Sequence, residues 1–129
     1  MGINKLSQYG IKELKDGLTL DKIKSDYSWV LKAVIKDAVL GEQDGHLLWY
    51  KGIWKDGTWR DGNWRDGTWK NGVWKCGNWK DGIWYRGYWE GGNWNGGYWK
   101  DGSQWFNDRY IRTSKSPNKH NTLIDDKKE

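Results

Sequence analysis

The chain has 129 residues, including 13 Trp, 18 Gly and a single Phe, and a formal net charge of +5. A chain of this length has room for one domain. It contains no apolar run long enough to span a membrane, and its first residues lack the apolar core of a signal peptide. We therefore expect a cytosolic or virion protein. The lone Cys76 excludes an internal disulfide and a zinc cluster built on cysteines.

The N-terminal segment is predicted to be a helical cap that covers residues 1–32. Apolar residues over 3–15 fall on one side of a short helix, which Gly17 would end. A second helix is predicted to begin near Thr19. From Ser28 to Leu40 the content of β-branched residues rises, and a hairpin through Asp44-Gly45 would lead into the next region. A repeat array needs such a cap to cover its open edge.

The central region is a five-residue repeat. From Gly52 onward, ten consecutive five-residue units, here called pentads, follow one another, and eight of them have the form G-x-W-x-[D/N/G]. Their central residues are Trp54, Trp59, Trp64, Trp69, Trp74, Trp79, Trp84, Trp89, Trp94 and Trp99, and Trp49 keeps the same phase one unit earlier. A helix is excluded, because one Gly in every five residues would cost roughly 1 kcal/mol each and a period of five matches no helical stripe.

Two all-β architectures fit this repeat. Asp-Gly or Asn-Gly pairs stand at five of the junctions between pentads, and the period of five requires a turn in every pentad, which leaves three extended residues between turns. In a β-solenoid, Gly and Trp point inward and the remaining positions face water. The alternative is a narrow antiparallel β-meander ribbon with Asp-Gly hairpins and all Trp on one face. We favour the solenoid, because it encloses the Trp rings that the ribbon would leave uncovered.

The pentads resemble those of pentapeptide-repeat proteins, which form right-handed β-solenoids with a small inward residue and a large one two positions later. Gly52/Trp54 through Gly97/Trp99 match that placement, and Ala33–Asp37 and Ala38–Leu40 read as two ordinary units of that family. The sequence is also similar to the Trp- and Gly-rich pentad arrays of tailed phages. That resemblance implies a phage origin, and with it the cytoplasm of an infected bacterial host or a virion as the location, and says almost nothing about activity.

The array is predicted to cover residues 33–113, together with a closing strand. In Gly102-Ser103-Gln104-Trp105 one residue would be inserted, so that the phase slips before the closing strand near Trp105-Phe106 and Tyr110-Ile111. The stretch 114–129 has few large apolar residues and is predicted to be a mobile tail.

Cations follow the early Trp residues and form the first candidate site. On a regular scaffold they would make an outward ladder that could bind a phosphate backbone. The members of this ladder are Lys55, Arg60, Arg65, Lys70, Lys75 and Lys80. An Asp comes directly after four of them, so much of the field is cancelled, and a role in solubility and pairing between units is the stronger interpretation.

The later pentads carry the second candidate site. Tyr85, Tyr88 and Tyr98 replace smaller or charged residues there, and with Glu90 they give this end a more aromatic, less cationic surface. Such rings could dock a protein or, as a third possibility, a glycan. Three asparagines, at 63, 78 and 93, recur at a spacing of fifteen, which hints at a triangular coil of three pentads with stacked amides.

No catalytic constellation is visible. His46 and His120 lie far apart, and no nucleophile elbow, phosphate loop or metal-binding spacing occurs. We expect no enzyme, no cofactor and no metal. The leading hypothesis is a non-enzymatic repeat scaffold that presents a rigid β surface for protein docking, as a phage virion accessory or a host-interacting protein. The alternatives are a nucleic-acid-binding protein or host-defence antagonist that uses the cation ladder, and a glycan-binding module.

Overall fold

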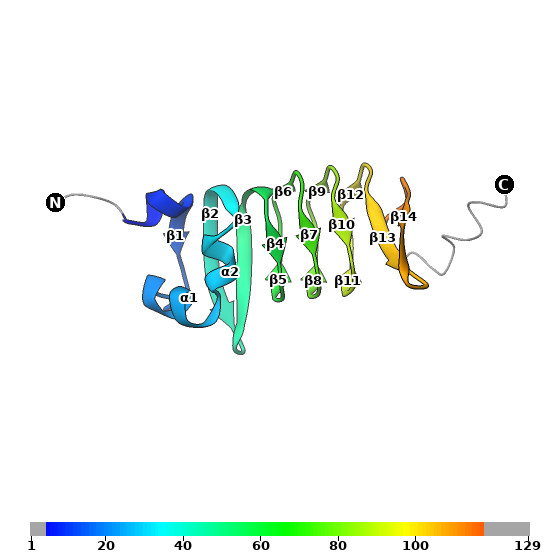
Figure 1. The fold of residues 1–129 in the computed structure, drawn as a ribbon. Coiled ribbons are helices and arrows are strands. Elements are labelled where there is room, and N and C mark those ends of the chain that lie inside the picture. Colours follow the sequence, from blue (N-terminus) through cyan, green and yellow to red (C-terminus); the bar gives the residue numbers. More distant parts are fainter. Residues whose placement is uncertain (1–4, 118–129) are drawn as a thin grey trace.

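A computed structural model describes residues 5–117. The molecule is elongated, with helices and a long hairpin at the N-terminal end, a stack of short strands in the middle and a second hairpin at the other end (Figure 1). It is mainly β, with 46% strand and 13% helix, and its parallel strands form a β-solenoid of about four turns. The predicted fold class is confirmed, and the antiparallel ribbon is wrong because successive coils pair in parallel.

Three pentads complete one coil, so the solenoid has three faces on which each strand pairs with the strand fifteen residues later. Face 1 contains the start of β3 (His46–Asp56), β5 (Asn63–Trp64), β8 (Asn78–Trp79) and β11 (Asn93–Trp94). Face 2 contains the later part of β3, β6 (Thr68–Trp69), β9 (Ile83–Trp84) and β12 (Tyr98–Trp99). Face 3 contains β4 (Thr58–Trp59), β7 (Val73–Trp74), β10 (Tyr88–Trp89) and β13 (Ser103–Phe106).

The glycines are needed because adjacent coils approach most closely at the turns. Val73 donates its backbone N–H to the Gly57 carbonyl at 2.9 Å. Gly72 has φ of +126°, and a Cβ placed on it would lie 2.2 Å from that same carbonyl oxygen. An L-residue with a side chain would meet both backbone strain and a steric clash at this position. The Gly in each pentad is thus set by the stacking of coils as much as by the turn.

The interior of the solenoid is filled by Trp. All eleven rings from Trp49 to Trp99 are at most 6% exposed. Within each column, rings of successive coils stack in parallel with centroids 4.6 to 5.0 Å apart and interplanar angles of 3° to 8°. Sequential rings in one coil meet edge to face, as Trp69 and Trp74 do at 5.9 Å. Both geometries are ones that aromatic pairs prefer, so the columns are held by packing as well as by burial.

Several indole N–H groups also tie one coil to the next. Trp59 donates to the Cys76 carbonyl, Trp64 to that of Asp81 and Trp69 to that of Arg86, each at 3.1 Å. These donors are satisfied inside the core, as buried polar groups usually are.

The N-terminal segment is only partly helical. A 3₁₀ helix, η1 (Lys5–Tyr9), is followed by β1 (Ile11–Leu14), which pairs in parallel with β2 (Val34–Gln43). The predicted helix over 3–15 is wrong, because Gly10 turns the chain with φ of +76° and lies against the Ile35 backbone, where no side chain would fit.

The second predicted helix is confirmed. It is α1 (Leu20–Asp26), and the Thr19 hydroxyl accepts a hydrogen bond from Lys22 N at 3.1 Å, as an N-cap residue does.

The start of each Trp column is covered by this N-terminal segment. The predicted hairpin through Asp44-Gly45 is confirmed: β2 pairs antiparallel with β3 under faces 1 and 2. A short helix, α2 (Ser28–Leu31), covers face 3, and the Trp29 ring meets the Trp59 ring edge to face at 5.1 Å. Ala33–Asp37 and Ala38–Leu40 do not form solenoid units, because their strand runs opposite to the coils.

The C-terminal end keeps the phase of the repeat. The predicted insertion is wrong: Gln104 pairs with Trp89 and occupies the inward Trp position, 5% exposed, with its Nε2 donating to the Lys115 carbonyl at 2.6 Å. Trp105 follows Gln104 and therefore points outward. The closing strand is β14 (Arg109–Arg112), antiparallel to β13. Of the predicted tail, residues 118–129 lie outside the described part of the chain.

Candidate interaction surface

Because Trp rings fill the interior, any binding by the solenoid must use its outside. Within residues 5–117, no three metal-binding side chains of the His, Cys, Asp or Glu type come together. None of the helices in that range is long and apolar enough to cross a membrane. The surface features that remain are three columns of residues, each made of the residues that come directly after the Trp residues of one face. We call them edge 1, edge 2 and edge 3, with the number of that face.

The six predicted cations do not form one ladder. Since equivalent positions recur every third pentad, consecutive cations fall on different edges. Edge 1 contains Tyr50, Arg65, Lys80 and Asn95; edge 2 contains Lys55, Lys70, Tyr85 and Lys100; edge 3 contains Arg60, Lys75, Glu90 and Trp105. Each edge thus receives two of the six, and Lys100 joins the pair on edge 2.

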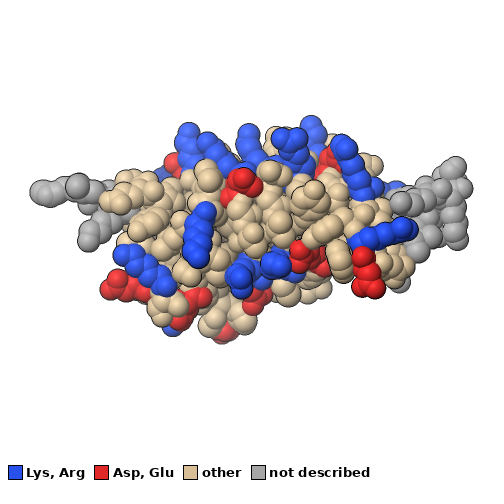
Figure 2. Space-filling view, viewed as in Figure 1, with Lys and Arg blue, Asp and Glu red and all other residues tan. Residues whose placement is uncertain are grey.

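Edge 2 gathers cations around one aromatic ring. The ammonium groups of Lys70 and Lys100 lie 5.6 and 5.5 Å from the centre of the Tyr85 ring, one from the coil before and one from the coil after. These are cation–π distances. Figure 2 shows a row of Lys and Arg along the upper margin, over the strands β6, β9 and β12 of Figure 1.

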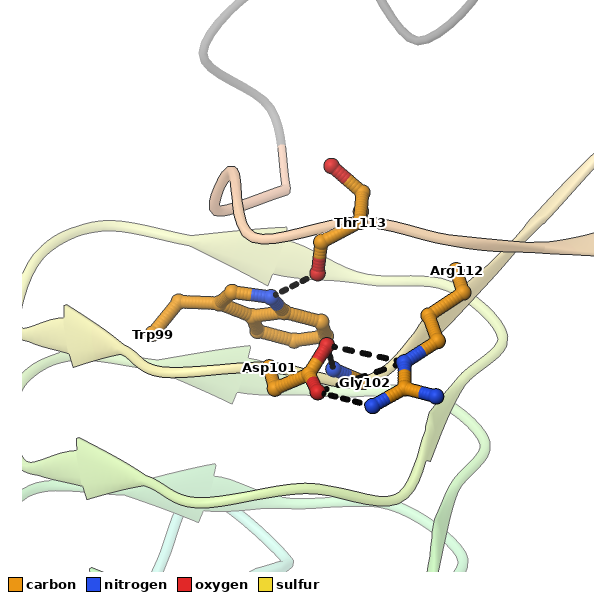
Figure 3. Close-up of polar contacts among 5 residues, drawn as sticks. All are labelled: Trp99, Asp101, Gly102, Arg112 and Thr113. Atoms are coloured by element: carbon orange, nitrogen blue, oxygen red, sulfur yellow. Dashed lines mark hydrogen bonds and ion pairs between the residues drawn. The ribbon is translucent and has the colours of Figure 1, made fainter.

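The carboxylate nearest to this cluster is already engaged. Asp101 receives three hydrogen bonds from Arg112, the shortest from Nη2 to Oδ2 at 2.6 Å, and one from the Gly102 backbone N–H at 2.8 Å (Figure 3). The Arg112 guanidinium holds the pKa of this carboxyl below its usual value. A hollow of about 580 Å³ lies beside Asp101 and is lined by Lys70, Tyr85, Arg86 and Lys100.

Two of the four predicted docking residues come together on face 3. Tyr88 and Glu90 lie there beside two side chains that the sequence did not indicate, Trp105 and Tyr110. The Tyr110 ring is 4.8 Å from Tyr88 and 5.0 Å from Trp105, and its hydroxyl donates to Glu90 at 2.5 Å. Burial and this carboxylate raise the pKa of Tyr110 to about 12. We call Tyr88, Trp105 and Tyr110 the aromatic end patch.

The other two docking residues lie elsewhere. Tyr85 belongs to edge 2, and Tyr98 is 60% exposed on face 2, next to Ile83 in the sheet. Counting pentads past Trp99 would have identified Trp105, because Gln104 then takes the inward position and its neighbour must face outward. Tyr110 gave no comparable signal, since it reaches the patch only through the hairpin β13–β14.

Face 1 carries the amide ladder that the spacing of fifteen indicated. Asn78 donates to Asn63 at 2.9 Å, and Asn93 donates to Asn78 at 2.8 Å. A shallow groove of about 570 Å³ runs along these side chains and is bordered by Arg65 and Lys80. The amide groups hydrogen-bond to one another, so face 1 presents a regular polar surface.

A comparison of the chain with models of known families, with curated proteins and with solved structures found no match. What can be stated is the class: a β-solenoid whose Trp residues recur about every five residues, consistent with a pentapeptide-like repeat.

Proposed function

We propose that this protein is a non-catalytic scaffold that docks another protein through the aromatic end patch. One observation carries the proposal. Tyr88, Trp105 and Tyr110 are 46%, 46% and 38% exposed, in a molecule that buries eleven other large rings almost completely. Exposed aromatic side chains that cluster and are held in place are the residues that dominate binding energy at protein interfaces.

The patch is preorganised for binding. Its rings pack against one another, and Tyr110 is fixed by its hydrogen bond to Glu90, which Lys75 also approaches at 3.4 Å. Little side-chain entropy would therefore be lost on association. The rings sit at the end of a stack of rigid coils, so a partner would meet a fixed surface. The occupant that fits is a protein with an apolar recess for the Trp105 ring.

The phage setting belongs to the same proposal. Its support is the resemblance of the pentads to Trp- and Gly-rich arrays of tailed phages. A virion accessory protein or a host-interacting protein would both use a rigid surface without a chemical centre, and the two differ in whether the partner is encoded by the phage or by the bacterium.

The test compares a variant of the aromatic end patch with a variant of an exposed tyrosine outside it. The double variant Tyr88→Ser/Trp105→Ser removes two rings of the patch, whereas Tyr98→Ser removes a tyrosine from face 2 that is more exposed, at 60% against 46% for Tyr88. After native recovery from the bacterial host, we expect a stoichiometric protein partner with wild type and Tyr98→Ser, identified by mass spectrometry, and its loss from the double variant. If the double variant still retains the partner protein, or if only Tyr98→Ser loses it, the aromatic end patch is not the docking site.

A further inference from the structure

We infer that edge 2 and the hollows beside it bind the phosphate backbone of a single-stranded nucleic acid. The binding groups are Lys70, Arg86 and Lys100, arranged around Tyr85, and Lys55 extends the same edge by one coil. This surface meets the aromatic end patch only at Tyr88, and the inference does not rest on the proposal that the patch docks a protein.

These cations have no carboxylate partner among the described residues, although Lys70 and Lys100 contact the Tyr85 ring. Lys75 is paired with Glu90, Lys22 with Asp26 and Arg112 with Asp101. Among the residues the structure describes, Lys70, Arg86 and Lys100 form no ion pair. Like charges held near one another repel, and an anion bound among them relieves that repulsion.

In the two middle coils, the turns that follow edge 2 carry no carboxylate, unlike those that follow edge 1. On edge 1, Arg65 is followed by Asp66 and Lys80 by Asp81, so each cation has a carboxylate next to it in sequence. On edge 2, Lys70 is followed by Asn71, and Tyr85 by Arg86. At Lys70 and Tyr85, edge 2 therefore lacks the carboxylate that would compensate its positive charge. After Tyr85 it also has a further cation, Arg86.

Two carboxylates remain beside edge 2: Asp56, which follows Lys55 in the first coil, and Asp101, whose charge does not oppose an anion. Asp101 borders the cluster, but its oxygens accept from Arg112 and from the Gly102 N–H (Figure 3). Arg112 therefore offsets the charge of Asp101. The Arg112 side chain is itself 78% exposed and lines a second hollow, of about 430 Å³.

The shape favours an extended ligand over a single ion. The hollows of about 580 and 430 Å³ share Tyr85, Arg86 and Asp101, so they form a continuous path from the lysines of edge 2 to Tyr88 on face 3. A basic path with exposed aromatic rings alongside is the arrangement by which proteins hold single strands, with phosphates on the cations and bases on the rings.

The experiment measures binding of a fluorescein-labelled dT12 strand to the full chain by fluorescence anisotropy across a salt series. Wild type is compared with Lys70→Gln/Lys100→Gln and with a control of identical charge change on edge 1, Arg65→Gln/Lys80→Gln. We expect the edge 2 variant to bind about tenfold or more weakly at low salt, because two phosphate contacts are lost. Its slope of log K against log salt should fall by about 1.4. The control should stay within about threefold of wild type.

Three results would overturn the inference. The first is no binding of dT12 by wild type at 50 mM salt, and the second is an equal loss in both double variants. The third is binding of a poly-aspartate peptide, or of a duplex of the same length, as tightly as dT12. That result would assign edge 2 to an acidic protein or to double-stranded DNA. The aromatic end patch is intact in all of these variants, so its own test is unaffected.

Discussion

The early and late coils of the solenoid have the same interior and different exteriors. Trp54 stacks on Trp69 at 5.0 Å and Trp84 on Trp99 at 4.8 Å, with interplanar angles of 5° and 7°. Outside, the early coils carry Lys, Arg and Asp in alternation, whereas the late coils carry tyrosines, Glu90 and additional glycines. The stacking of coils constrains the Gly and Trp positions and leaves the others free to vary, so differences in function must be sought at those other positions.

The largest expected effect lies in the interior. Trp69→Ala removes a ring that stacks on both sides, and it should lower the free energy of unfolding by about 3–5 kcal/mol. Trp99→Ala, at the end of a column and 4% exposed, should cost less, because it stacks on one ring only and the space can be refilled more easily. Denaturant unfolding measures both. Equal losses of unfolding free energy in the two variants would mean that the position of a ring within its column does not affect how much the ring stabilises the protein.

The next effect concerns the turns. Gly72→Ala places a methyl group 2.2 Å from the Gly57 carbonyl at a positive φ, and should destabilise the protein by roughly 2 kcal/mol or more. Gly91→Ala, where the nearest atom would be 3.5 Å away and φ is not in the left-handed region, should lie within about 0.5 kcal/mol of wild type. Thermal unfolding distinguishes them. If Gly72→Ala unfolds at the same temperature as wild type, the coils do not approach each other closely at this turn.

The amide ladder offers a smaller difference between inner and end positions. Asn78→Ala removes two side-chain hydrogen bonds, while Asn93→Ala removes one. Because these groups are solvent-exposed, we expect losses of about 1 kcal/mol and about half that. Unfolding midpoints measured on the two variants should keep that order. A reversed order would show that the ladder does not stabilise the coils.

The smallest effect is a pH dependence at the C-terminal end. The Asp101 pKa is lowered from 3.8 in the folded protein by Arg112, so the stabilisation is present above that value and is lost as pH falls below it. Asp101→Asn should therefore be less stable than wild type at neutral pH, and the gap should narrow below about pH 4. Stability measured against pH tests this. If the difference in stability between wild type and Asp101→Asn stays constant down to pH 2, it arises from packing and not from the charge of Asp101.

The sequence was sufficient for the repeat and its consequences. The period of five and the Asp-Gly turns led to the solenoid, and the spacing of Asn63, Asn78 and Asn93 indicated the triangular coil that the strand pairing shows. These features are local or strictly periodic, so they could be derived from the chain alone. The helix at Thr19 and the hairpin at Asp44-Gly45 were recognised for the same reason.

Elements that depend on the neighbouring coil were missed. Residues Ile11–Leu14 form a strand because β2 offers an edge, although their apolar spacing also suited a helix. An inserted residue was predicted before Trp105, while the strand register keeps the phase and places Gln104 inside. The cations were read as one ladder along the chain, but a coil of three pentads distributes them over three edges.

The most direct test of the account is hydrogen exchange at the indole N–H groups, followed by NMR. If the eleven rings from Trp49 to Trp99 form the dry interior of the coils, their Nε1 protons should exchange slowly, while that of Trp105, which is 46% exposed, exchanges fast. Fast exchange at most of the eleven positions would contradict a Trp-filled solenoid.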